Sequence, residues 1–143
     1  MMSQPSERIA LVGTIDPVNG NNSTLNSDYV DMSKFAEALF IFQLGSVDST
    51  VACLVRESLN TSDAGGQTLS GKSATTLTAT DDNKIVLINV KAEELTTGYR
   101  YLRGRMTVGA GTTNLVSCVA LGIKPRFGPA SDDNLADVAQ IVT

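Results

Sequence analysis

The residue types that most often perform catalysis are scarce in this chain, and one of them is missing. The 143 residues include no histidine, which removes the commonest general base near neutral pH and the commonest transition-metal ligand. A Ser–His–Asp or Cys–His arrangement therefore cannot form, and two cysteines alone do not complete a tetrahedral zinc site. The sequence has no GxxxxGK[ST] motif and no GxGxxG motif after a predicted strand. We therefore expect no enzymatic activity, no cofactor and no small-molecule substrate.

The carboxylate groups offer three weak alternatives. Asp81–Asn83 and Asp132–Asn134 could supply oxygen ligands to Ca²⁺, but neither run has the spacing of an EF-hand loop. A turn for the first run and a helix cap for the second are favoured. Glu93 and Glu94 are adjacent, so they do not face each other as a glycosidase acid pair would. An acid pair assembled from distant carboxylates is the enzyme alternative that stays open.

Composition indicates a folded protein made in a cytoplasm. Hydrophobic residues are 42% and charged residues 18% of the chain, a balance that argues against disorder, and the net charge of −4 disfavours nucleic acid as a partner. The polar start and the lack of a run of roughly 20 apolar residues predict neither a signal peptide nor a membrane partner. We expect Cys53 and Cys118 to be reduced core thiols, with a disulfide open if their strands are neighbours.

Alternating and β-branched segments predict an all-β fold. Turn signals recur at roughly ten-residue spacing, which is typical of an antiparallel β-sandwich, here jelly-roll-like, over residues 26–123. Asn60–Gly71 has the composition of a loop, and Ala92–Leu95 that of a helical turn. The clearest strands are Ala38–Leu44, Ser49–Ser58, Lys84–Lys91, Tyr99–Val108 and Leu115–Gly122.

The strand predicted over Tyr99–Val108 has two different faces. The even-numbered positions Leu102, Gly104, Met106 and Val108 are the core side, because they are apolar or small. The opposite face carries Tyr99, Tyr101, Arg103 and Arg105. Tyr and Arg are enriched at protein interfaces, so these four residues are interface candidates. A solvated sheet face is the equally weighted alternative.

The two ends of the chain are predicted to be arms. Residues 1–25 form an N-terminal arm in which a short strand carries Ile9, Leu11 and Val12, followed by a Pro-, Gly- and Asn-rich loop. Residues 124–143 form a C-terminal arm, with Phe127 in an extended connector. A short helix capped by Ser131 and Asp132 follows, and its apolar stripe contains Leu135, Val138, Ala139 and Val142. These apolar side chains are expected to bury on adjacent subunits.

Four segments resemble small structural proteins encoded in the head gene clusters of tailed bacteriophages, namely capsid decoration, or cement, proteins. The segments are 29–35 (YVDMSKF), 77–84 (LTATDDNK), 99–109 (YRYLRGRMTVG) and 128–142 (GPASDDNLADVAQIV). The resemblance implies a β-sandwich or jelly roll, often a homotrimer, that binds the major capsid protein on the outer surface of an icosahedral capsid. It also implies a virion protein that is assembled in the cytoplasm of a bacterial host.

Two other binding functions are compatible with the same pattern. A head–tail joining protein would form a ring at one vertex of the virion. A fibre-associated β-sandwich module that binds carbohydrate or another surface would use Tyr99 and Tyr101 as a sugar platform. The absence of tryptophan and an aromatic content of 5% count against the second alternative.

Overall fold

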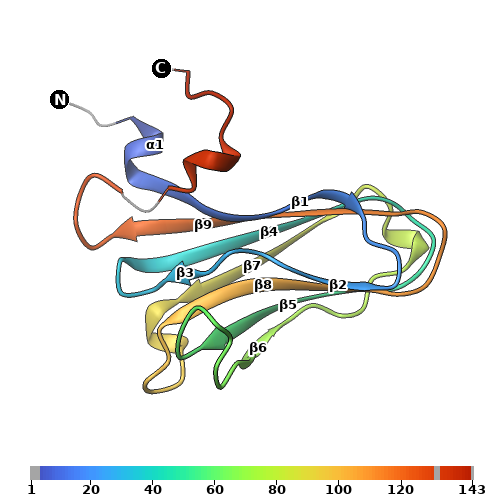
Figure 1. Cartoon of the computed structure of the whole chain (residues 1–143), viewed down its shortest axis with the longest axis horizontal. Coiled ribbons are helices and arrows are strands. Elements are labelled where there is room, and N and C mark those ends of the chain that lie inside the picture. The colour runs from blue at the N-terminus through green and yellow to red at the C-terminus, as the bar shows by residue number, and fades with distance from the viewer. Residues whose placement is uncertain (1–3, 131–132, 143) are drawn as a thin grey trace.

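The chain folds into two antiparallel β-sheets packed face to face (Figure 1). The structure, a computed structural model, describes residues 4–130 and 133–142. Three 3-10 turns lie at Ala79–Asp81, Ala92–Glu94 and Leu135–Asp137. The helix and strands are α1 (Pro5–Arg8), β1 (Ile9–Asn19), β2 (Ser23–Asn26), β3 (Val30–Asp31), β4 (Phe35–Val47), β5 (Val51–Ser58), β6 (Gln67–Ser73), β7 (Ile85–Lys91), β8 (Tyr101–Val108) and β9 (Asn114–Pro125).

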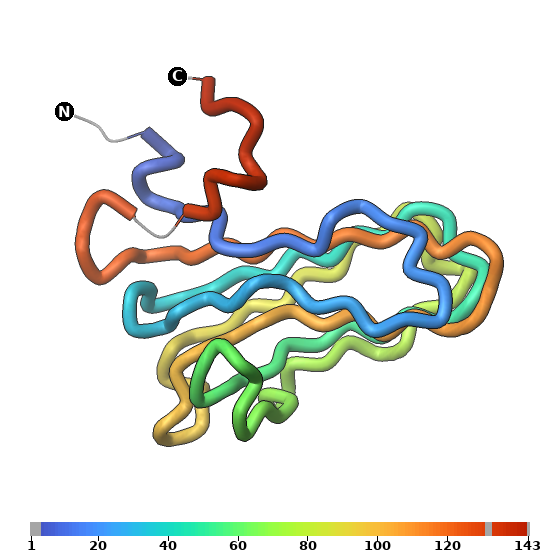
Figure 2. The backbone as a smooth tube through the Cα atoms, viewed as in Figure 1, coloured from blue at the N-terminus to red at the C-terminus, as the bar shows by residue number. Residues whose placement is uncertain are grey.

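The strand order is that of a jelly roll. The first sheet has the order β1-β9-β4-β7, and the second has the order β2-β8-β5-β6, with β3 pairing with β8. The first and last strands are neighbours, and the chain passes repeatedly between the sheets, as the tube in Figure 2 shows. This wrapping of two Greek keys into two sheets defines a double-sheet jelly roll. The predicted all-β sandwich is therefore confirmed.

The core lies between the sheets and is filled by the inward residue of each alternating pair. Phe40 and Phe42 are fully buried and their rings stack at 6.4 Å. Cys53 from one sheet and Cys118 from the other are buried free thiols, which confirms the interpretation of both as core residues. Burial raises the pKa of each thiol to about 12, so neither is a reactive thiolate.

The prediction of an N-terminal arm over residues 1–25 is wrong from Ile9 onward. Strand β1 pairs with β9 along its length, from Ile9 opposite Ile123 to Asn19 opposite Leu115, and β2 pairs with β8. The sandwich therefore begins at residue 9 rather than at residue 26. Val12 is buried in the core of its own subunit and is not available to a neighbour. The segment joins the sheet because a strand at the sheet edge needs only a few inward apolar residues. In β1 these residues are Ala10, Val12 and Ile15, all of them buried.

The C-terminal segment is also attached more closely than predicted. Strand β9 continues to Pro125, beyond the predicted end at Gly122. In place of a helix of about ten residues, the segment forms a single 3-10 turn at Leu135–Asp137. The backbone nitrogen of Asn134 donates to Leu11 O at 2.7 Å, which binds the segment to the edge of β1. A helix of about ten residues is only marginally stable in water, so the hydrogen bond to β1 is favoured over the predicted helix. The predicted caps, Ser131 and Asp132, lie outside the described residues.

Two smaller boundaries also differ. Strand β6 occupies Gln67–Ser73, most of whose length was predicted as part of the loop Asn60–Gly71. Strand β8 begins at Tyr101 rather than Tyr99, because the nitrogen of Tyr99 closes a turn by donating to Thr96 O at 2.9 Å. The inward parity of β8 is confirmed, since Leu102, Gly104, Met106 and Val108 are all buried.

Candidate functional site

The outward face of β8 carries two of the predicted arginines, and the fold adds a third. Arg103 lies directly opposite Arg56 of β5, while Arg105 lies opposite Leu54. Like charges on directly opposed residues destabilise a sheet unless another charge compensates them. All three arginine side chains are well covered, with Arg56 and Arg103 each only 16% exposed. This face is therefore half-buried by contacts within the chain, and its role at an interface stays a prediction.

Asp63 compensates the three arginines from a loop. Its Oδ2 atom lies 3.5 Å from Arg56 Nη2, 3.8 Å from Arg103 Nη2 and 3.6 Å from Arg105 Nη2. We name these four residues, together with Tyr29, the arginine cluster. The loop is held in place by Asn60, whose Oδ1 accepts hydrogen bonds from the backbone nitrogens of residues 62 and 64. One carboxylate thus serves three guanidinium groups, which leaves a formal charge of +2.

Tyrosine rings extend this face on one side. Arg103 stacks over the ring of Tyr29 at 4.8 Å, and Tyr29 contacts Tyr101 edge to face at 6.3 Å. The hydroxyl of Tyr29 donates to Asp63 Oδ1, and burial raises the pKa of that hydroxyl. Tyr99 precedes β8, and its hydroxyl donates to Gly65 O. Tyr99 and Tyr101 are therefore held by different neighbours, which gives no support to a shared sugar platform.

The cluster carries an uncompensated positive field. Among the described residues, the buried Nε atoms of Arg56 and Arg103 have no hydrogen-bond acceptor. Burial lowers the pKa of Arg105, and repulsion from Arg56 and Arg103 lowers it further. By contrast, Arg100 forms a bidentate pair with Asp31 at 2.8 and 2.7 Å, the distances expected of strong charge-assisted bonds. Arg56 and Arg103 are therefore short of acceptors, whereas the Nε atom of Arg105 donates to Asn26 Oδ1 at 2.7 Å.

A second surface lies on the outward side of the first sheet, where apolar side chains form adjacent rows between polar positions such as Glu37 and Gln43. Leu39 of β4 lies opposite Leu121 of β9, which in turn lies opposite Leu11 of β1. One row along, Ile41 lies between Val119 and Leu87. We name the set the outer apolar face, and it comprises Ile9, Leu11, Leu39, Ile41, Ile85, Leu87, Val119, Leu121 and Ile123.

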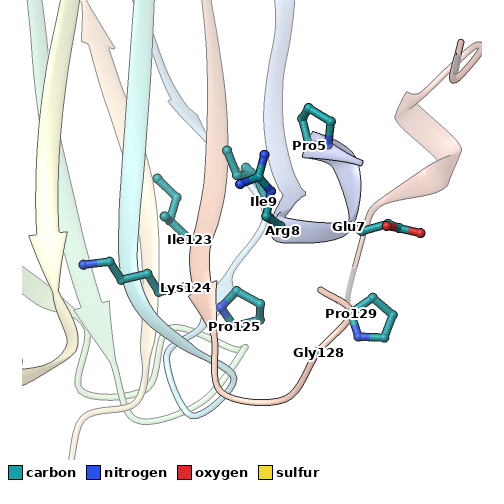
Figure 3. Close-up of a pocket in the computed structure, with 9 residues that line it drawn as sticks. All are labelled: Pro5, Glu7, Arg8, Ile9, Ile123, Lys124, Pro125, Gly128 and Pro129. Atoms are coloured by element: carbon teal, nitrogen blue, oxygen red, sulfur yellow. The ribbon is translucent and has the colours of Figure 1, made fainter. Parts of the chain in front are cut away.

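The outer apolar face is half-buried at its centre and open to solvent at two of its corners in the single chain. On the edge strand β7, Leu87 is 58% exposed and Ile85 54% exposed. At the opposite corner, Ile9 and Ile123 join a pocket of about 830 Å³ whose walls come from α1, the start of β1, the end of β9 and the loop after it (Figure 3). Contiguous apolar surface of this kind marks interaction sites in soluble proteins.

The C-terminal segment presents further apolar side chains beside that corner. Figure 1 places α1 and this segment together at one end of the sandwich. The segment is fastened by polar contacts, including the hydrogen bond that Leu11 N of β1 donates to the side-chain Oδ1 of Asp133 at 2.8 Å. Phe127 and Val142 are nevertheless each 81% exposed, Leu135 is also exposed and Val138 is half-buried. The segment is thus held on its own subunit while most of its apolar groups face outward, and their role at an interface stays a prediction.

The candidate carboxylate groups are engaged in local structure. Asp82 Oδ1 accepts from Val47 N, and Asp81 accepts from Thr78 N and from Lys84 Nζ. Glu94 accepts from Lys91 N and pairs with Lys72. Within residues 4–130 and 133–142, no group of three or more Cys, Asp or Glu side chains is placed to hold a metal ion. In the same residues no helix is long and apolar enough to cross a membrane.

Sequence reasoning missed the members of both surfaces that come from elsewhere in the chain. Leu39 and Ile41 belong to a continuous apolar run that was interpreted as a buried strand. A strand in such a run carries apolar side chains on both of its faces. This pattern could have predicted an apolar surface on the outward side of the sheet. Arg56 and Asp63 gave no signal, because the pairing of β5 with β8 brings Arg56 to Arg103, and only a loop folded back onto the sheet brings Asp63 there.

Comparison with known proteins adds no family assignment. A scan against protein-family models gives no match, and a search of the curated proteins gives none either.

Proposed function

We propose that this chain is a virion structural protein of the capsid-decoration class, which binds the outer surface of an icosahedral phage capsid and stabilises it, assembling with copies of itself as a homotrimer. The observation that carries the proposal is the outer apolar face on a complete jelly-roll sandwich. A core between two sheets accounts for the apolar residues on one side of each strand, whereas the outward side of the first sheet carries nine more apolar residues beside polar ones such as Glu37, Gln43 and Asn89. The capsid, the trimer and the virion location come from the sequence resemblance.

The energetics favour assembly through this face. Burying one Val, Leu or Ile side chain completely contributes about 1.5–3 kcal/mol. Association costs an estimated 4–15 kcal/mol before any surplus appears as affinity, so one contact is insufficient. The face brings nine apolar side chains together on one sheet, and the C-terminal segment, which carries the exposed Phe127 and Val142, lies at one end of the sandwich. A neighbouring subunit or a capsid protein that covers them would supply the required burial.

The test is the mass of the purified protein in solution, alone and with empty capsid shells from its own virus. We expect an oligomer that co-sediments with the shells. The variants Ile41→Lys and Leu87→Lys place a charge on the outer apolar face, so each should reduce self-association or shell binding at least tenfold. Leu59→Lys is the matched control, because Leu59 is 49% exposed on a loop of the other sheet.

Two results would contradict the proposal. A wild-type chain that is monomeric and leaves shells unbound would remove the decoration function. Full assembly by both lysine variants would exclude the outer apolar face as the contact surface. The number of copies per virion separates a decoration protein from a head–tail joining ring, since a ring occupies one vertex.

A further inference from the structure

We propose that the arginine cluster is a binding site for carboxylate groups, and that its ligand is an acidic peptide segment of a protein partner. This inference goes beyond the proposed function, because it concerns the opposite sheet and follows from the charges there. Arg56, Arg103 and Arg105 converge on a single carboxylate, that of Asp63, and the cluster keeps a formal charge of +2 on a chain whose net charge is −4.

Asp63 satisfies the three arginines only in part, because Arg56 Nη2 donates to its Oδ2 atom at the long distance of 3.5 Å, and the Nε atom of Arg105 donates to Asn26 Oδ1 instead. The Oδ2 atom of Asp63 lies 3.5–3.8 Å from the nearest nitrogens of the three arginines. Charge-assisted N–H···O bonds are commonly about 2.7–2.9 Å long, and Arg100 attains that length with Asp31 in this same molecule. Asp63 therefore partly neutralises the cluster from the middle without forming a close pair with any member. The three arginine side chains keep 16–22% of their surface exposed, and a second carboxylate would bind through that exposed part.

The shape of the charge favours a peptide carboxylate over a nucleic acid. Arg recognises carboxylate through two parallel N–H donors, and two spare charges match one or two acidic side chains. A phosphate backbone instead requires a stripe of cations. Arg100, the arginine that precedes β8, does not extend the cluster into such a stripe, because it is paired with Asp31 and stacks on Tyr101.

The experiment titrates the full-length chain at low salt with hexaglutamate, and with hexaglutamine as the uncharged control, by isothermal titration calorimetry. We expect saturable binding of hexaglutamate only. Arg103→Gln should weaken that binding at least tenfold, whereas Arg126→Gln, which removes the same charge from an exposed position outside the cluster, should change it less than twofold. Asp63→Asn removes the internal competitor and should strengthen the binding at least threefold.

The last expectation has the opposite sign from the one that a purely structural ion-pair network predicts. Equal heats with both peptides, or no gain from Asp63→Asn in a variant with wild-type circular dichroism, would overturn the proposal. A twelve-nucleotide oligothymidylate that binds as tightly as hexaglutamate and is lost in Arg103→Gln would overturn the assignment to carboxylates. These readouts need no capsid, so a failure of the site and a failure of the decoration function are distinguishable.

Discussion

At the scale of single residues, the Asp31–Arg100 pair is the clearest electrostatic contribution to stability. The hydrogen bonds from Arg100 lower the pKa of Asp31 to about 2, and bonds from the backbone and hydroxyl of Ser33 act in the same direction. A carboxyl group whose pKa falls on folding stabilises the folded state above its unfolded pKa. That contribution is lost as the pH falls from about 4 toward 2.

This pair gives a pH-dependent prediction. Asp31→Asn should lower the free energy of unfolding at pH 7 by about 1–2 kcal/mol, a range reduced for the exposure of Arg100. Most of the difference from the wild type should be lost near pH 2, where Asp31 is protonated in the unfolded state and about half protonated in the folded state. Urea unfolding at pH 7, 4 and 2 measures it, with Glu93→Gln on an exposed turn as the control. A difference that is the same at every pH would contradict the assignment.

At the scale of elements, two glycines in the strands leave space for aromatic rings of the core. Gly122 of β9 lies under the buried ring of Phe35, and a Cβ added there would meet three ring carbons at 2.7 Å. Gly104 of β8 has the same role beneath Phe42 in the other sheet, with a closest approach of 3.0 Å. These glycines let large aromatic rings fill the space between the sheets. Each such ring matters for core packing, because aromatic residues are only 5% of the chain.

We therefore predict that Gly122→Ala destabilises the protein. Overpacking of a well-packed core costs about 1–3 kcal/mol. The added methyl group would overlap the ring of Phe35, which is fully buried, so the ring or the backbone of β9 would have to shift. The urea midpoint should fall while the slope of the transition is unchanged. Gly128→Ala is the control, since a Cβ there meets nothing within 4 Å. Equal midpoints for the two variants would show that β9 and Phe35 readjust at no cost.

At the scale of the whole molecule, the first strand completes the fold. Strand β1 pairs with β9, so residues near 10 meet residues near 120. Folding must close that long loop before the first sheet is complete, and such non-local pairing folds slowly. The N-terminal region is thus part of the folding unit, whereas the segment after Pro125 adds contacts to a sandwich that is already complete.

Two truncations test this division. Removal of residues 1–25 deletes β1 and most of β2, so we expect a chain without cooperative unfolding. Removal of residues 126–143 should leave a folded sandwich with a distinct thermal transition, because the fully buried core residues all precede it. Thermal circular dichroism measures both, and removal of residues 1–8 serves as the control. A cooperative transition in the chain that lacks residues 1–25 would contradict the structure.

The sequence by itself determined the fold class, the inward parity of β8 and the burial of the two thiols. Successive side chains of a strand point to opposite faces because of local backbone geometry, so the alternation is the same in any sheet that buries one face. Only the tertiary structure decided that Ile9–Asn19 is a core strand, that the C-terminal segment lies along β1, and that Arg56 and Asp63 join Arg103. Those outcomes depend on pairing between distant strands and on a loop folding back, and local residue patterns do not encode either one.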